Sequence, residues 1–350
     1  MKHIKNFKTI KFLFLISSLS YFSLTQAENS VTLYGLIDAG LTVVSNQQGF
    51  VNYKVDTGVM QGNRWGLKGK EQLNENLHAI FNIEGGFRLD DGTIAQSGQL
   101  FGRLAIVGLE IKNVGTLTFG RQYDFMDSIG TGYALSGNEF ATTMAYSIHK
   151  RDRIGGDRID NSIKFISTPI ADITGGILLG LGEDAQSKQK NQTISAILGY
   201  KGIKNLDTNI AFTRINKGLG KQQILAGAGK YDLGFGKING LATFVRDNSA
   251  LLTLKSNTYE IGYMHKITPK LSAGIGYQFF DEKTNNQTKD DIHNASIALD
   301  YNLSKRTDAY FTTIISKGRG NARPNLTGIT NEQSNSNNQV ALRVGLRHKF

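Results

Sequence analysis

The sequence predicts an all-β fold, a transmembrane 16-stranded antiparallel β-barrel. Three observations lead to this prediction: apolar and polar residues alternate in runs of about ten, short and long connections alternate between the runs, and the chain begins with an export-type segment. With 39% hydrophobic residues and 20% charged residues, the chain is too apolar to be disordered. Because it has no cysteine, it can form no disulfide and no thiolate metal site.

The first segment has the layout of a secretory signal peptide. Residues 1–11 are rich in lysine, residues 12–24 form an apolar stretch, and Thr25-Gln26-Ala27 supplies small residues before a cleavage site. A short membrane anchor is the alternative, but the apolar stretch is well below the ~20 residues that a spanning helix needs. We therefore predict a signal peptide at 1–27 and one transmembrane β-barrel domain at 28–350.

The charge of the chain is positive but spread out. The formal net charge is +11, and four of the positive charges belong to the predicted signal peptide, at Lys2, Lys5, Lys8 and Lys11. Because no acid precedes Glu28, removal of the signal peptide leaves +7. Such a charge attracts anionic solutes over long range. The basic residues form no dense cluster, so nucleic acid is not expected as a partner.

The strand pattern has period two throughout the predicted domain. Clear runs occur at 77–88, 272–279, 294–301 and 340–347. A soluble β-sandwich also alternates, but its strands average ~5–6 residues, whereas about ten residues are needed for a tilted strand to cross a bilayer. The polar faces carry charges and many glycines, as expected for a water-filled lumen, and aromatic residues end several apolar stripes, at Tyr200, Tyr301 and Phe350. Strands can span lipid only in a closed barrel.

The connections between these runs alternate in length. Seven short turns are expected near residues 74–76, 112–115, 168–171, 202–205, 233–236, 268–270 and 303–306. Eight longer loops are expected at 45–62, 89–100, 124–157, 183–191, 217–221, 247–256, 281–291 and 317–338. Fifteen connections imply sixteen strands, an even number as in single-chain bacterial barrels.

The longest loop, 124–157, has an unusual charge distribution. Its first part contains the acids Asp124, Asp127 and Glu139, its exit at 149–153 is basic, and glycines and other small residues are frequent. This composition fits an exposed surface loop. It also fits a loop that folds into the lumen and narrows it, and periodicity alone does not separate the two.

Enzyme chemistry fits the sequence poorly. None of the six histidines has metal-ligand spacing, and neither an HExxH motif nor a Gly-x-Ser-x-Gly motif is present. The acid pairs Asp90-Asp91 and Asp290-Asp291 lie in predicted loops, where solvated turn charges are common. We therefore expect no catalytic residues, no cofactor and no metal. The alternatives are an outer-membrane barrel enzyme of the protease or lipase type and an adhesive or structural barrel with a closed lumen.

Several short segments, in order and well spaced, resemble the trimeric general diffusion porins of Gram-negative outer membranes. They are Val31–Asp38, Asn63–Glu71, Arg103–Leu109, Val114–Asp124, Arg158–Lys164 and Val344–Phe350. The resemblance implies a barrel in the cell outer membrane, surrounded by lipid, assembled as a homotrimer and narrowed by an inward-folded third loop. It also implies a water-filled channel for passive diffusion of ions and small hydrophilic solutes.

The same resemblance implies a set of constriction residues. In that family, arginines on the barrel wall face acids on the inward loop, and the matching wall positions here are Arg64, Arg103 and Arg158. The candidate acids are Asp124, Asp127 and Glu139, of which Glu139 matches the Glu-Phe of the family's Pro-Glu-Phe-Gly motif. Opposed charges across a narrow aqueous passage select ions. We expect a weak anion preference.

The loop also departs from the family pattern, and the chain end matches it. Asn138 replaces the proline of the motif, Ala141 replaces its glycine, and Leu135 stands where some relatives carry a second acid. The final residue, Phe350, matches the terminal aromatic that the family's barrel-assembly machinery reads. The resemblance therefore implies this machinery as a partner and Phe350 as the assembly signal.

Overall fold

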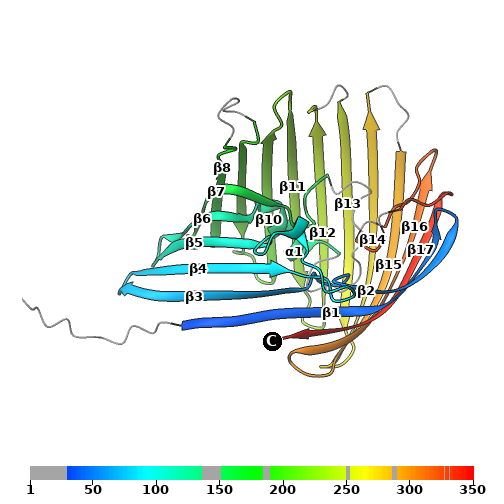
Figure 1. Ribbon diagram of the computed structural model, residues 1–350, viewed down its shortest axis with the longest axis horizontal. Coiled ribbons are helices and arrows are strands. Elements are labelled where there is room, and N and C mark those ends of the chain that lie inside the picture. The colour runs from blue at the N-terminus through cyan, green and yellow to red at the C-terminus, as the bar shows by residue number, and fades with distance from the viewer. Residues whose placement is uncertain are drawn as a thin grey trace, which may run out of the picture.

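The computed structural model describes residues 30–135, 151–183, 190–249, 253–285, 290–326, 328–330 and 332–350. Most of them belong to one antiparallel sheet (Figure 1). Its strands are β1 (Ser30–Gln47), β2 (Phe50–Thr57), β3 (Arg64–Asn74), β4 (Leu77–Gly86), β5 (Leu104–Ile111), β6 (Gly115–Tyr123), β7 (Arg158–Ser167), β8 (Ile173–Gly180), β9 (Thr193–Tyr200), β10 (Leu206–Asn216), β11 (Lys221–Asp232), β12 (Gly236–Asp247), β13 (Leu254–Lys266), β14 (Leu271–Thr284), β15 (Asp290–Asn302), β16 (Thr307–Arg319) and β17 (Asn338–Lys349). The described helices are a 3₁₀ turn at Gln96–Gly98 and α1 (Phe125–Tyr133).

The seventeen strand segments close into a barrel of sixteen strands. On one edge, β1 pairs with β17, and from β3 to β17 each strand pairs with its neighbour in sequence. On its other edge, β1 pairs with β2 along Ala39–Gln47 and with β3 along Ser30–Leu36. β2 and β3 therefore share one strand position, which residues 58–63 interrupt. The predicted number of strands is confirmed.

The predicted alternation is confirmed by the exposure of the side chains. In β17, the side chains of Val340, Leu342, Val344 and Leu346 point to the outer, lipid-facing surface, and Arg343 and Arg347 are buried on the lumen side. The same division holds in β15, where Ile297 and Leu299 are exposed. Tyr200, Tyr301 and Phe350 are exposed at the turn end of the barrel, as expected for an aromatic girdle.

The short turns occur where the sequence predicts them, but the first long loop does not. Each of the seven predicted short turns joins two neighbouring strands. The segment expected to be a loop at 45–62 is instead mostly a hairpin, because β1 continues to Gln47 and β2 begins at Phe50. In this segment Val51, Tyr53 and Val55 alternate with polar residues. This alternation is typical of a strand, although the segment as a whole is polar. Only residues 58–63 remain irregular.

Residues 58–63 are fixed to the barrel wall at Asp38 of β1. The Asp38 carboxylate accepts backbone hydrogen bonds from Met60 at 2.6 Å and Gln61 at 2.9 Å. Asp38 also forms an ion pair with Arg343 of β17 and accepts a hydrogen bond from the Tyr310 hydroxyl of β16. The segment is therefore an ordered part of the lumen wall.

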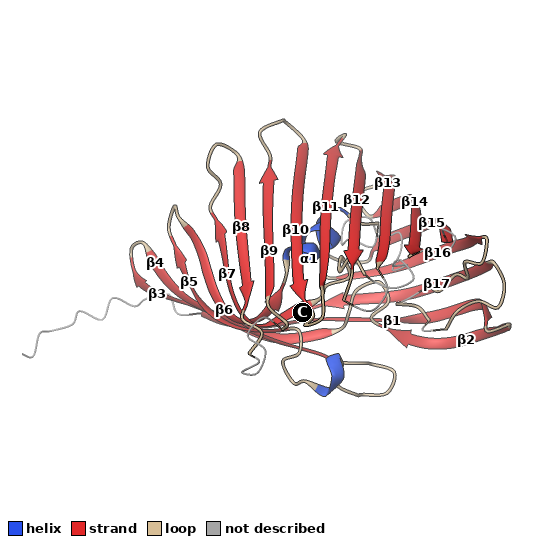
Figure 2. Cartoon of the chain, turned by 90° about the horizontal axis from the view of Figure 1, so that it is seen from above, coloured by secondary structure: helices blue, strands red, loops and turns tan. Residues whose placement is uncertain are grey.

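The first part of the long loop 124–157 lies inside the barrel. Its helix α1 contacts β9, β10, β11 and β12, and Figure 2 shows it on the concave side of these strands. The predicted inward fold of the third loop is confirmed. Among the described residues, no helix is both long and apolar enough to cross a membrane.

Candidate functional site: the channel constriction

Helix α1 begins at a capped N-terminus and packs on the inner wall through an apolar face. Asp124 is the N-cap, and its side chain accepts the Met126 backbone N–H at 3.1 Å. Phe125, Met126 and Ile129 are buried in one cluster with lumen-facing side chains of β7 to β12, namely Ile159, Leu178, Ala211, Ile224, Ala226, Leu241 and Val245. Apolar burial therefore fixes the position of the helix within an otherwise polar lumen.

The end of α1 is attached to strands β10 and β13 of the wall. The Tyr133 hydroxyl donates to Asp207 of β10 at 2.6 Å, and the Leu135 backbone N–H donates to Glu260 of β13 at 2.9 Å. The Leu135 side chain fills a hollow on the inner wall where Gly262 and Gly276 lack side chains. Leu135 thus anchors the loop.

The return segment of the loop is held by buried polar contacts. The Asp152 carboxylate accepts hydrogen bonds from Thr243 at 3.1 Å and Thr258 at 3.2 Å, and Arg151 donates to Glu282 of β14 at 3.0 Å. Because Asp152 is completely desolvated, its pKa is raised. Together with α1, this segment brings the loop from β6 to the inner face of β14.

The three predicted wall arginines lie close together, around Tyr123. Arg158, the first residue of β7, lies over the Tyr123 ring, with its guanidinium 4.3 Å from the ring centroid, and Arg103 is 6.0 Å from the same centroid. The Arg64 Nε donates to the Gly62 carbonyl at 2.9 Å, and Arg64 lies within electrostatic range of Arg103. We call Arg64, Arg103 and Arg158 the arginine group.

Asp127 of α1 faces this positive region from the loop. It interacts electrostatically with Arg158, Lys164 and Arg103. Burial is the largest influence on its carboxyl and raises its pKa to about 6, although the nearby cations act in the opposite direction. Asp127 therefore carries its negative charge at neutral pH and loses it in mildly acidic solution.

The other predicted acids differ in their positions. The Asp124 side chain is 0% exposed and forms an ion pair with Arg153 at 2.6 Å, so it stabilises the loop and offers no surface to a passing ion. Burial raises the pKa of Asp124, and Arg153 opposes that rise. Glu139, together with Asn138 and Ala141, lies outside the described residues.

Two of the three wall arginines lie on strands, and the third does not. Arg64 and Arg158 begin β3 and β7, but Arg103 lies one residue before β5. Its guanidinium is held by an ion pair instead, with Nε 2.6 Å from the Glu84 carboxylate. Because Arg103 is only 8% exposed and is paired, Glu84 offsets much of its charge.

Sequence reasoning missed three members of the site, Glu84, Tyr123 and Lys164. Glu84 accepts hydrogen bonds from Arg103 and from the Tyr34 hydroxyl at 2.9 Å. Lys164 donates to the Tyr123 carbonyl at 2.9 Å. Alternation places Glu84 on the lumen face of β4, so its strand position was available as a signal. The pattern does not show which cation of the neighbouring segment Glu84 approaches.

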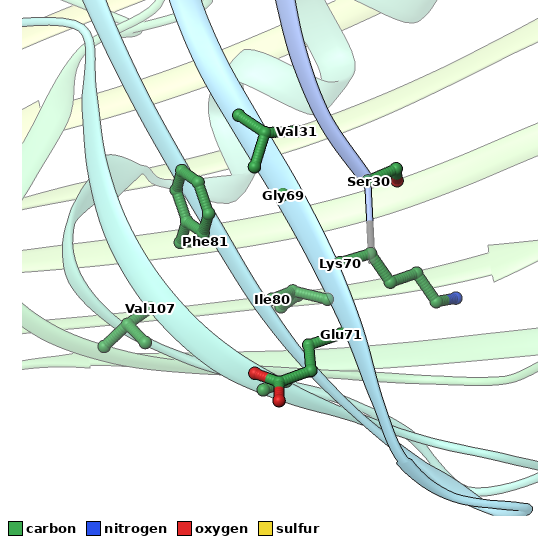
Figure 3. A pocket seen from close by; sticks show the side chains of 9 residues that line it. Ser30, Val31, Gly69, Lys70, Glu71, Ile80, Phe81 and Val107 are labelled. Atoms are coloured by element: carbon green, nitrogen blue, oxygen red, sulfur yellow. The ribbon is translucent and has the colours of Figure 1, made fainter. Parts of the chain in front are cut away.

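A separate apolar hollow lies on the outer wall, away from the channel (Figure 3). It has a volume of about 390 Å³, and its apolar lining includes Val31 of β1, Phe81 of β4 and Val107 of β5. The Phe81 ring lies over Gly69 of β3, in the space where a side chain at 69 would lie. These residues face lipid and take no part in the constriction.

A closed barrel with a charged loop folded into it is the architecture of a channel, and comparison with known proteins agrees. The family profile described as Gram-negative porin matches residues 17–321. The chain belongs to the Gram-negative porin family. It is 28% identical to an outer membrane porin protein of Bordetella pertussis, in an alignment that covers 93% of this chain and 95% of that protein.

Two solved structures show the same fold as this porin. The anion-selective porin from Comamonas acidovorans has a TM-score of 0.81 at 22% identity and covers 92% of this chain and 100% of its own. The trimer form of OmpT, an outer membrane protein of Vibrio cholerae, has a TM-score of 0.70 at 15% identity, with 92% and 99% covered. The family match and the Bordetella relative show an outer-membrane porin, and its barrel crosses the membrane many times.

Proposed function

We propose that this porin passes ions and small hydrophilic solutes passively, with a weak preference for anions, and that it works as a homotrimer. The observation that carries the proposal is the grouping of Arg64, Arg103 and Arg158 opposite the single described loop acid that faces them, Asp127. Lys164 adds a further positive charge. Two structurally similar proteins support the preference and the assembly: one is an anion-selective porin, and the other is an outer membrane protein in a trimer form.

The size of the preference follows from the wet environment. Arginine remains charged at every relevant pH. In water, a unit charge contributes about 1 kcal/mol to an ion at 4 Å, and salt weakens this further. Such energies change relative permeability several-fold without excluding ions of either sign. Asp127 and Glu139 would reduce the preference.

The proposal also covers export and assembly of the chain and the absence of enzyme activity. Residues 1–27 are the signal peptide, the mature chain is the barrel at 28–350, and barrel-assembly machinery inserts it into the outer membrane. The protein is not an enzyme and needs no cofactor or metal; membership of a family of channels supports this. The mature charge of +7 supports long-range attraction of anions.

The test is the reversal potential of the purified porin in planar bilayers under a salt gradient. We expect weak anion selectivity for the natural chain, and a shift toward cations for the double variant Arg64→Gln, Arg158→Gln. The single variant Lys204→Gln, which removes an exposed charge from a periplasmic turn, should behave like the natural chain. An unchanged potential in the double variant would show that the arginine group does not set selectivity. Absence of conductance steps would contradict the diffusion channel itself.

A further inference from the structure

A polar pocket lies on the loop side of the arginine group, where the loop between β16 and β17 meets β2 and the turn after β4. Its volume is about 430 Å³, within the range of about 300–1,000 Å³ that small-ligand pockets occupy. Strand β2 runs from the hairpin tip toward the middle of the barrel, where Arg64 begins β3, so Lys54 and Asp56 lie nearer the loop end than Arg64 does. Because Tyr53 and Val55 are exposed on the outer wall, Lys54 and Asp56 face the lumen.

The loop between β16 and β17 forms one side of the pocket because it also folds inward. Leu326 and Ile329 are buried in a cluster with lumen-facing side chains of β1, β16 and β17. The Leu326 backbone N–H donates to the Gln339 side chain at 3.0 Å. Glu332 of the same loop accepts a hydrogen bond from the Gln47 side chain of β1 at 3.0 Å. This side of the pocket is therefore attached to the barrel wall.

The turn after β4 forms another side. The Leu89 backbone N–H donates to the Thr57 hydroxyl of β2 at 3.2 Å. The Arg88 backbone N–H donates to the Thr93 carbonyl at 2.8 Å, which closes the turn. These contacts place Arg88 and Asp90, on either side of Leu89, at the pocket. A pocket whose sides are already fixed loses little conformational freedom when it takes up a ligand, and this favours binding.

Charges of both signs line the pocket without neutralising one another. Arg88, Asp90 and Glu332 are all exposed, and none of them forms an ion pair with another residue that the structure describes. Asp90 lies within electrostatic range of Lys54 but is not paired with it. One cation and two carboxylates thus remain available to a ligand that carries both a negative and a positive group.

Lys54 adds a second cation, and two aliphatic residues add apolar surface. The Lys54 ammonium group pairs with Asp56 at 3.1 Å and donates to the Ile329 carbonyl. Because an ammonium group has three donors, one of them is left for a ligand. Buried Val59 and Ile329 supply the apolar part of the lining. The pocket therefore combines two cations, two available carboxylates and a small apolar surface.

We propose that this pocket binds a small zwitterion, an aliphatic α-amino acid, on the loop side of the constriction. The carboxylate of the amino acid lies between Arg88 and Lys54, and its ammonium group lies between Asp90 and Glu332. An arginine fork binds a carboxylate through two parallel hydrogen bonds, and an ammonium group donates to carboxylates. A simple anion or cation would meet charges of its own sign in the same pocket, whereas a zwitterion satisfies both.

The test measures binding by saturation-transfer difference NMR on the full mature chain refolded in neutral detergent. The probes are L-valine, isovalerate, which lacks the ammonium group, and isobutylamine, which lacks the carboxylate. Valine should give a saturable signal from the natural porin. The dissociation constants of both analogues should be at least about ten-fold higher, because each loses its charged hydrogen bonds at one end. The double variant Arg88→Gln, Glu332→Gln should lose valine binding to the same extent.

Matched variants separate this pocket from general charge. The variant Glu75→Gln, Lys204→Gln also removes one charge of each sign, from exposed positions at the turn end, and should bind valine like the natural chain. Heat-modifiable electrophoretic mobility shows that each variant has folded. The single variants Arg88→Gln and Glu332→Gln should each weaken valine binding, which gives a second measurement if the double variant does not fold.

Three outcomes would overturn the proposal. They are the absence of a saturable valine signal from the natural chain, undiminished binding by the folded variants at Arg88 and Glu332, and isovalerate binding as tight as that of valine. The last outcome would identify a site for anions in general. Binding in detergent requires neither a membrane nor a current, so this result is independent of the reversal potentials that test the diffusion channel.

Discussion

At the scale of single residues, Asp127 should make the ion preference depend on pH. Burial raises its pKa to about 6, so the carboxylate is ionised at pH 7.5 and largely neutral at pH 5. Its protonation removes a negative charge beside Arg158 and Lys164, so the anion preference should increase as the pH falls, by up to roughly five-fold for one charge in water. Reversal potentials recorded between pH 5 and 8 would show the step. Asp127→Asn should abolish it and hold the channel at its acidic value.

Glu84 should limit the anion preference by offsetting Arg103. Its carboxylate lies 2.6 Å from the Arg103 Nε, so Glu84→Gln leaves the arginine without a counter-charge and should increase anion selectivity several-fold. Glu110→Gln is the matched control, because Glu110 pairs with Lys70 in an exposed part of the barrel. The reversal potential should shift only for Glu84→Gln. Equal shifts in the two variants would mean that net lumen charge, and not position, decides selectivity.

Residue identity could be predicted at this scale, but contacts could not. The resemblance identified Arg64, Arg103 and Arg158, and the structure brings them together around Tyr123. That Asp124 is a buried helix cap depends on α1 folding against the wall, which no local pattern contains. Lys164 was missed for the same reason, because its importance arises from a contact with another strand.

At the scale of elements, the packing of α1 against its own return segment should depend on Gly130. A Cβ at Gly130 would overlap the Ile154 carbonyl, whereas one at Gly132, in the same helix, would meet nothing within 4 Å. Gly130→Ala should therefore cost about 1–3 kcal/mol through overpacking, and Gly132→Ala should stabilise the helix by up to about 1 kcal/mol. In bilayer recordings, the first change should alter conductance and raise open-channel noise. Recordings identical to those of Gly132→Ala would contradict this packing role.

The elements themselves were largely readable from period-two alternation and turn composition. The exception, the hairpin of β1 and β2, has polar residues and glycine around its tip at Gln48–Gly49, and composition alone suggests a loop there. The interruption at 58–63 depends on hydrogen bonds to Asp38, which precedes Met60 by 22 positions. Such long-range polar contacts determine where a strand is interrupted, and they leave no periodic pattern in the sequence.

At the scale of the whole molecule, deletion of Phe350 should affect assembly of the porin in the cell without affecting closure of the barrel. The backbone of Phe350 exchanges two hydrogen bonds with Gly35, each of 3.1 Å, and its ring lies where a side chain at 35 would be. The β1–β17 seam, however, is held mainly by nine further residue pairs, from Leu36–Lys349 to Val44–Ala341. A chain without Phe350 should therefore close normally, refold in detergent and conduct like the natural porin.

If the terminal aromatic is the signal for assembly, the same deletion should lower the amount of folded porin in the outer membrane of cells, and Phe350→Tyr should restore it. Heat-modifiable electrophoretic mobility measures both quantities; an equal loss in detergent and in cells would show that Phe350 acts only through the seam.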